Sequence, residues 1–266
     1  MTSHEVTTAA PVTVSRVTAE QIVERSPGVP DALRPALQEV AASTERLLTT
    51  VRSMSDDAAR APSLLPGWTR GHVLTHLARN ADGLVNLATW ASTGVEHPMY
   101  PGGREGRDAD IEAGAGRPVA ELLADLEASA GRLLRALTAF PEDGLDRLVR
   151  TGSGAELPGR GIPLGRIREI EIHHVDLGLD YTPAHWPLPF VERTLDELAE
   201  LFRTKRQCQV AALRGTRTER TWRVGGGGPV LTGQEPALLA WLTGRSSGDG
   251  LLSDTGDAVP AAPTWV

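Results

Sequence analysis

Two short stretches of this chain constrain its fold more than any other part of the sequence. Residues 71–83 read GHVLTHLARNADG, and residues 166–181 read RIREIEIHHVDLGLDY. Each stretch has apolar residues at helical spacing and carries histidine or carboxylate side chains four residues apart. Histidines and carboxylates are costly to bury unless another group pairs with them. Two such helices in one chain therefore indicate a shared partner, and a metal ion is the simplest one.

Helical spacing of apolar residues recurs in four long segments before residue 182. The predicted helices cover 31–60, 69–91, 118–140 and 163–179, and the glycine- and proline-rich segments 94–116 and 151–163 are predicted loops. Four long helices are typical of an antiparallel bundle, which can hold a metal among its facing side chains. We therefore expect a mainly α protein with a four-helix bundle over residues 29–182.

The sequence pattern changes after residue 182. A helix is predicted over 190–203, strands over 207–213 and 218–224, a glycine turn at 225–228 and a helix over 235–242. This order predicts a small C-terminal α+β domain over residues 183–266. Residues 1–28 are polar and lack helical spacing, so we expect a poorly ordered extension there.

Composition argues against several classes of protein. No apolar run approaches the roughly 20 residues that a membrane helix needs, and the N-terminus lacks a secretory signal pattern, so a cytoplasmic protein without a membrane partner is expected. The net charge of −7 disfavours nonspecific nucleic-acid binding. Cys208 is the single cysteine, which excludes a disulfide framework and a multi-cysteine zinc site within one chain. We expect a monomer, with Cys208 as a packed thiol.

The predicted helix over 163–179 offers two candidate pairs of metal ligands. Residues four apart lie about 40° apart around a helix, so Glu169 and His173 share one face, with Asp176 on the same side. Glu171 and His174 share a different face. Periodicity alone does not choose between the two pairs.

On the predicted helix over 69–91, His76 lies nearer the apolar stripe than His72 does, so His76 is the better candidate to point inward. Asn80 lies one turn beyond His76 and could support it. Two histidines and one carboxylate from separate helices suit zinc with an open fourth position. Another divalent metal would also accept this set.

Three segments of the chain together resemble a known family. They are GWTRGHVLTHLARNADGLVNLATWA (67–91), MYPGGREGRDADIEAGAGR (99–117) and REIEIHHVDLGLDY (168–181). Their order and spacing are similar to those of the mycothiol-dependent maleylpyruvate isomerases, which belong to the wider DinB/YfiT-like group of metal-binding four-helix bundles. The resemblance extends from about residue 31 to the C-terminus.

The resemblance implies a set of site residues. The family's metal triad falls on His76, Glu169 and His173, which favours the first of the two pairs. An important arginine of the family's C-terminal domain corresponds to Arg245, and Arg104 and Arg107 resemble residues on the substrate side. We assign Arg245 and Arg107 to catalysis and Asn80 and Arg104 to cofactor binding.

The resemblance also implies a reaction, the cis–trans isomerisation of maleylpyruvate to fumarylpyruvate in gentisate breakdown. A thiolate can add reversibly to a double bond and leave a single bond that rotates before the thiol departs. Mycothiol would supply that thiol, zinc or another divalent metal would lower its pKa, and arginines would hold the anionic dicarboxylate substrate. The alternatives are another mycothiol S-transferase or thiol-adduct enzyme on the same scaffold, and a non-catalytic metal-stabilised binding module.

Overall fold

The computed structural model describes Ser26, residues 28–205 and residues 208–264. The predicted extension over 1–28 lies outside the described residues apart from Ser26 and Gly28. Within the described part of the chain, no helix has the length and apolar character needed to cross a membrane.

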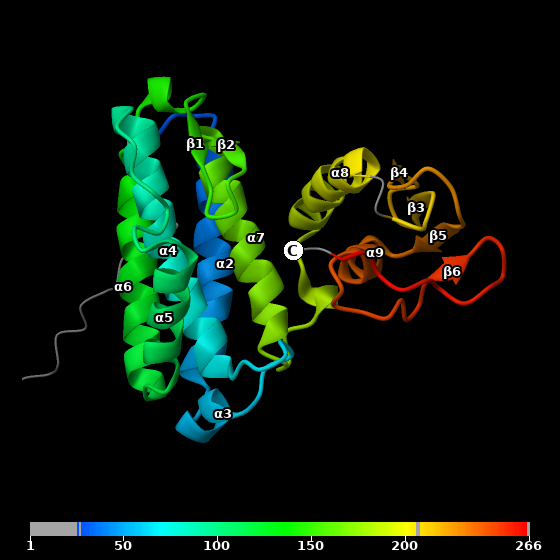
Figure 1. Ribbon diagram of the computed structural model, residues 1–266, viewed down its shortest axis with the longest axis horizontal. Helices are drawn as coiled ribbons and strands as arrows, with labels where there is room; N and C mark the ends of the chain where they lie inside the picture. Colours follow the sequence, from blue (N-terminus) through cyan, green and yellow to red (C-terminus); the bar gives the residue numbers. More distant parts are fainter. Residues whose placement is uncertain (1–25, 27, 206–207, 265–266) are drawn as a thin grey trace, which may run out of the picture.

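Four long helices form a bundle (Figure 1). They are α2 (Arg34–Arg52), α4 (Arg70–Thr93), α6 (Val119–Thr138) and α7 (Ile162–Asp176). Helices α2 and α4 each pack against both α6 and α7, so the four helices enclose a common core. The predicted four-helix bundle and the mainly α fold are confirmed. The predicted first helix is divided, because Ser55 caps a separate short helix, α3 (Asp56–Arg60).

Contacts at the helix ends fix the directions within the bundle. The backbone N–H of Val119 donates to Asp56, and the guanidinium of Arg70 donates to the carbonyl oxygen of Leu177. The beginnings of α4 and α6 therefore lie at the same end as the ends of α2 and α7. Helices α4 and α6 run in one direction, and α2 and α7 run in the other.

Helix α5 (Gly103–Ala115) occupies most of the segment that was predicted as a loop over 94–116, so that prediction is wrong. Glycines at 103, 106 and 114 lower the helix propensity of this segment, but packing against α4 overrides it. A Cβ atom on Gly71 would overlap the carbonyl oxygen of Ala115, and one on Gly114 would lie 2.6 Å from Thr75 Cγ2. Glycine at both positions lets α5 approach α4 closely.

The predicted loop over 151–163 is also wrong in part. Strand β2 (Glu156–Pro158) pairs antiparallel with β1 (Leu148–Arg150), and α7 begins at Ile162. Strands of three residues are too short to show an alternating pattern in the sequence.

The chain after α7 forms a small α+β unit, as predicted. It contains α8 (Leu188–Lys205), α9 (Glu235–Leu242) and a sheet of β3 (Ala212–Gly215), β4 (Thr221–Arg223), β5 (Val230–Gly233) and β6 (Leu252–Ser253). The strand order is β4-β3-β5-β6, with β3 and β5 parallel and the other pairs antiparallel. Strands β3 and β4 begin later than predicted, and β5 and β6 were not predicted. The domain bounds at residues 182 and 183 stay a prediction.

Helix α7 packs on both parts of the molecule, which explains why it is apolar on two sides. Ile170 contributes to the core of the bundle, whereas Ile172 and Val175 join the core of the C-terminal unit. Figure 1 shows this unit beside α7, with α8 and α9 on the side of the sheet that is nearer the bundle. An ion pair of 2.9 Å between Arg193 of α8 and Glu39 of α2 also joins the two parts.

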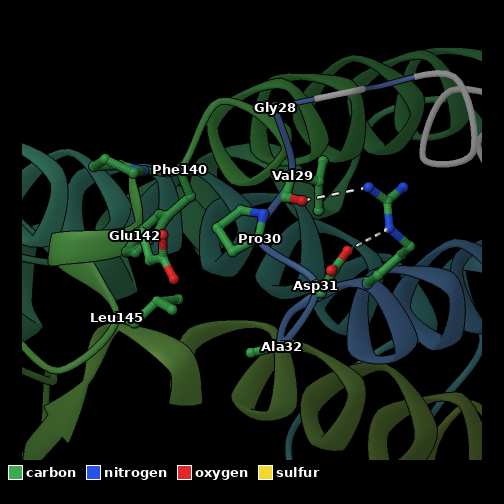
Figure 2. A pocket seen from close by; sticks show the side chains of 10 residues that line it. Gly28, Val29, Pro30, Asp31, Ala32, Phe140, Glu142 and Leu145 are labelled. Carbon is green, nitrogen blue, oxygen red and sulfur yellow. Dashed lines mark hydrogen bonds and ion pairs between the residues drawn. The ribbon is translucent and has the colours of Figure 1, made fainter.

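A cavity of about 420 Å³ lies where α2 begins and α6 has ended (Figure 2). Pro30, Phe140 and Glu142 contribute to its lining. None of the predicted site residues lines it. This end of the bundle is opposite to the end at which α4 begins, so the cavity is separate from the site described next.

Candidate metal centre

Three predicted ligands from two antiparallel helices meet inside the bundle. His76 of α4 places its Nε2 atom 3.0 Å from Oε2 of Glu169 on α7. The Nε2 atom of His173, one turn further along α7, is 3.7 Å from the same oxygen. One donor atom from each residue lies within 4.8 Å of the other two, and the two imidazole rings meet edge to face at 4.6 Å.

The local structure of α4 explains the position of His76. Thr69 and His72 cap the helix reciprocally, since the backbone N–H of each residue donates to the side chain of the other. His76 is one turn further along, on the inward face, and is buried next to the ring of Trp68 at 5.7 Å. His72 therefore has a capping role, and its Nε2 atom pairs with Glu112 at 3.1 Å.

The protonation states of His76 and Glu169 favour metal binding. Burial lowers the pKa of His76, so its imidazole is neutral at pH 7. Burial alone would raise the pKa of Glu169, but the hydrogen bond to His76, the neighbouring histidines and Arg166 together lower it to about 2. A neutral imidazole and an ionised carboxylate are the forms in which these side chains bind metals.

The chemistry of this donor set fits a divalent metal with an open coordination position. Two imidazoles and one carboxylate match the three-ligand sets of catalytic zinc sites. The Nδ1 atom of His76 is buried and has no hydrogen-bond partner among the described residues. This nitrogen points away from Glu169, so Nε2 is the His76 atom that faces the other two side chains and is available to a metal.

The second candidate pair on α7 has different neighbours. Glu171 accepts hydrogen bonds from Ser43 and Arg46, each at 2.5 Å, and from the hydroxyl of Tyr181. His174 contacts Thr50 at 2.8 Å and stacks on Tyr181. These contacts satisfy both side chains without a metal, and they attach α7 to α2 and to the segment after α7.

Arg245 forms an ion pair with the buried Asp176 beside the triad. Two nitrogens of the Arg245 guanidinium donate to the two carboxylate oxygens of Asp176, at 2.8 and 3.1 Å. Asp176 in turn lies 2.8 Å from Nδ1 of His173. Burial would raise the pKa of Asp176, but the hydrogen bonds to His173 and Arg245 lower it. The predicted catalytic arginine therefore reaches the triad through Asp176 in this structure.

The two arginines of α5 differ in exposure. The side chain of Arg107 is 24% exposed, lies 5.9 Å from the ring of Tyr100, and is close enough to His76 to contribute to its lowered pKa. Arg104 is 86% exposed and, together with Tyr100 and Arg150, lines a cavity of about 190 Å³. Arg107 thus lies near the triad, and Arg104 lies at the surface.

Asn80 has a different partner from the one expected. Its side-chain oxygen accepts a hydrogen bond of 2.9 Å from Arg166 of α7, not from His76. Arg166 was not predicted as a site residue, although it lies three residues before Glu169 and therefore on the same side of α7. It is fully buried, which lowers its pKa to about 10, and its Nη2 atom has no hydrogen-bond partner among the described residues.

Tyr100, also not predicted, lies beside these residues. Burial and the charge of Glu169 raise the pKa of Tyr100 to about 12, so its hydroxyl remains protonated. Cys208 is buried in the C-terminal core, and burial raises the pKa of its thiol, which fits a packed residue.

Residues 40–178, slightly more than half of the chain, match the family described as the mycothiol maleylpyruvate isomerase N-terminal domain. The chain belongs to this family. The match spans the bundle from the first turns of α2 to the end of α7, and it includes all three residues of the triad.

Two solved structures are similar to this chain over most of its length. One is a crystal structure of the mycothiol-dependent maleylpyruvate isomerase, with a TM-score of 0.82, and the other is of a single-residue mutant of that enzyme, with a TM-score of 0.81. Each is 29% identical to this chain and covers 88% of it, and 97% of the solved chain is matched. The likeness thus includes the C-terminal unit. No curated protein sequence matches the chain.

Proposed function

We propose that this protein catalyses the mycothiol-dependent cis–trans isomerisation of maleylpyruvate to fumarylpyruvate. The observation that carries the proposal is the convergence of His76, Glu169 and His173 in a member of this family. The neutral imidazole of His76, the ionised carboxylate of Glu169 and the approach of His173 to the same carboxylate oxygen support a divalent metal there, and we propose zinc.

A bound divalent metal would lower the pKa of the mycothiol thiol, and the resulting thiolate would add reversibly to the substrate's double bond. The residues of the chain would bind and orient the reactants. His76 and His173 would present nitrogen lone pairs and Glu169 one negative charge. These three ligands leave space for a fourth, since the side chain of Glu169 is 32% exposed and that of His173 is 18% exposed.

Cationic residues near the triad suit an anionic dicarboxylate. Arg107 lies on α5, which packs along α4, and its side chain is partly exposed, so it can bind a substrate carboxylate. The protonated hydroxyl of Tyr100 is a hydrogen-bond donor on the same side. Arg104 is exposed at the surface, where its charge would attract anions to this side of the molecule.

The test is an assay of maleylpyruvate isomerisation by the zinc-loaded protein, with and without mycothiol. We expect turnover only when both the thiol and the metal are present. His76→Ala should lose metal and activity together. His72→Asn is the matched control, because it changes a histidine one turn earlier on α4 that caps the helix, and it should retain both.

Three results would contradict the proposal. Absence of turnover with saturating thiol and zinc would exclude the isomerase, and turnover of a different electrophile with mycothiol would favour the S-transferase alternative. Unfolding on metal removal combined with no binding of mycothiol in calorimetry would favour a metal-stabilised binding module.

A further inference from the structure

Asp176 lies between a proposed metal ligand and the C-terminal unit. Its Oδ2 atom is 2.8 Å from Nδ1 of His173, while the opposite ring nitrogen of His173 faces Glu169. An ionised carboxylate can only accept hydrogen bonds, so Nδ1 of His173 carries the proton. The lone pair is then on Nε2, the atom that faces the centre of the triad.

The position of Asp176 is fixed by its backbone and by Arg245. Asp176 is the last residue of α7, and its carbonyl oxygen accepts a hydrogen bond of 2.8 Å from the N–H of Leu64. Its side chain is 2% exposed, so its charge needs a partner, and the planar fork of the Arg245 guanidinium donates to both carboxylate oxygens.

The end of α9 fixes Arg245 in turn. Gly244 adopts a positive φ of 73°, and the N–H of Arg245 donates to the carbonyl oxygen of Ala240 at 2.7 Å, which closes the helix with a left-handed turn. Another guanidinium nitrogen of Arg245 donates to the carbonyl oxygen of Thr243 at 2.7 Å. The Arg245 side chain is therefore aimed at α7 by the structure of the C-terminal unit itself.

We propose that Asp176 and Arg245 are positioning residues that orient His173 for metal binding, so that docking of the C-terminal unit on α7 completes the metal centre. The two histidine ligands differ in support. His173 has a carboxylate on its outer nitrogen, whereas Nδ1 of His76 has no partner among the described residues. This inference rests on the proposed metal centre and differs from a direct contact between Arg245 and substrate.

The experiment measures zinc affinity by chelator competition and the absorption spectrum of the cobalt-loaded protein. The variants are Asp176→Asn, Arg245→Met and the double variant. We expect each single variant to weaken metal affinity by about 10- to 100-fold and to alter the cobalt spectrum, because the orientation of His173 is lost. The double variant should be little weaker than either single one, because both changes interrupt the same contact.

Arg193→Met is the matched control. Arg193 pairs with Glu39 through two nitrogens and also joins the C-terminal unit to the bundle, but at a site away from the triad. Arg193→Met should lower the midpoint of urea unfolding of the metal-free protein and leave the metal affinity and the cobalt spectrum unchanged. Equal loss of metal affinity in the control would overturn the specific role of Asp176 and Arg245.

Two further outcomes would also overturn the proposal. The proposal would be overturned if Asp176→Asn and Arg245→Met had the metal affinity and cobalt spectrum of the wild type. A raised KM in Arg245→Met with unchanged metal affinity would instead assign Arg245 to substrate binding. Neither readout of metal binding requires isomerase activity. A wild-type protein that binds metal but does not isomerise maleylpyruvate would therefore contradict the proposed function alone.

Discussion

Glu171 and His174 have the composition of a metal-binding pair but lie in a hydrogen-bond network on the other side of α7. A spacing of four residues places two side chains on the same face of a helix, but it does not indicate which neighbouring helix that face contacts. Tertiary packing decides the outcome: one face of α7 meets His76 on α4, and the other meets Ser43 and Arg46 on α2. The family resemblance favoured Glu169 and His173, the pair that lies beside His76, whereas periodicity did not choose between the pairs.

Replacement of Glu171 by alanine tests this division of roles. The side chain of Glu171 is 1% exposed and accepts hydrogen bonds from three groups, so Glu171→Ala should destabilise the fold by about 3 kcal/mol in urea unfolding. Zinc affinity should remain that of the wild type. The control is Glu197→Ala, which removes a partly exposed ion pair with Arg168 and should change stability by less than about 0.5 kcal/mol.

If Glu171→Ala lost zinc binding while keeping wild-type stability, the Glu171 and His174 pair would be the metal ligands.

The residues that sequence reasoning missed share one property. Arg166, Tyr100 and the partnership of Asp176 with Arg245 acquire their roles from contacts between segments that are far apart in the chain. Spacing along one helix gives no signal for such contacts.

Helix α5 was not predicted from the sequence. Its glycines lower helix propensity, yet Gly71 and Gly114 allow α4 and α5 to pack closely, and this contact stabilises α5. The four bundle helices were predictable because each has a long apolar face, whereas α5 buries only Ile111, Gly114 and Ala115. The position of α5 matters for the proposed function because α5 carries Arg104 and Arg107, the proposed substrate-side arginines.

Gly71→Ala should therefore displace α5. The added Cβ atom would overlap the backbone carbonyl oxygen of Ala115, which has no freedom to rotate away. We expect a raised KM for the dicarboxylate, because Arg107 moves, with a smaller effect on zinc affinity. The control is Gly106→Ala on α5 itself, where a Cβ atom has no neighbour within 4 Å and alanine should stabilise the helix slightly. Equal KM values in the two variants would show that the close approach of α4 and α5 does not position the arginines.

At the scale of the whole molecule, composition and periodicity predicted a bundle followed by a small α+β unit. They did not predict that α4 and α6 run in the same direction. These directions arise because α5, which was not predicted, brings the chain back to the end of the bundle at which α4 begins. They also did not predict that the C-terminal unit docks on α7 beside the triad. Helix α7 is apolar on two sides because it belongs to both cores, and this shared position brings Arg245 to Asp176.

His76, Glu169 and His173 are proposed to hold one divalent metal. Anomalous X-ray diffraction from crystals of the zinc-loaded protein, recorded on both sides of the zinc absorption edge, tests this proposal most directly. We expect a single strong peak within bonding distance of one atom from each of the three residues, about 2.0–2.2 Å from each. A peak between Glu171 and His174, or no peak among His76, Glu169 and His173 at full zinc loading, would contradict it.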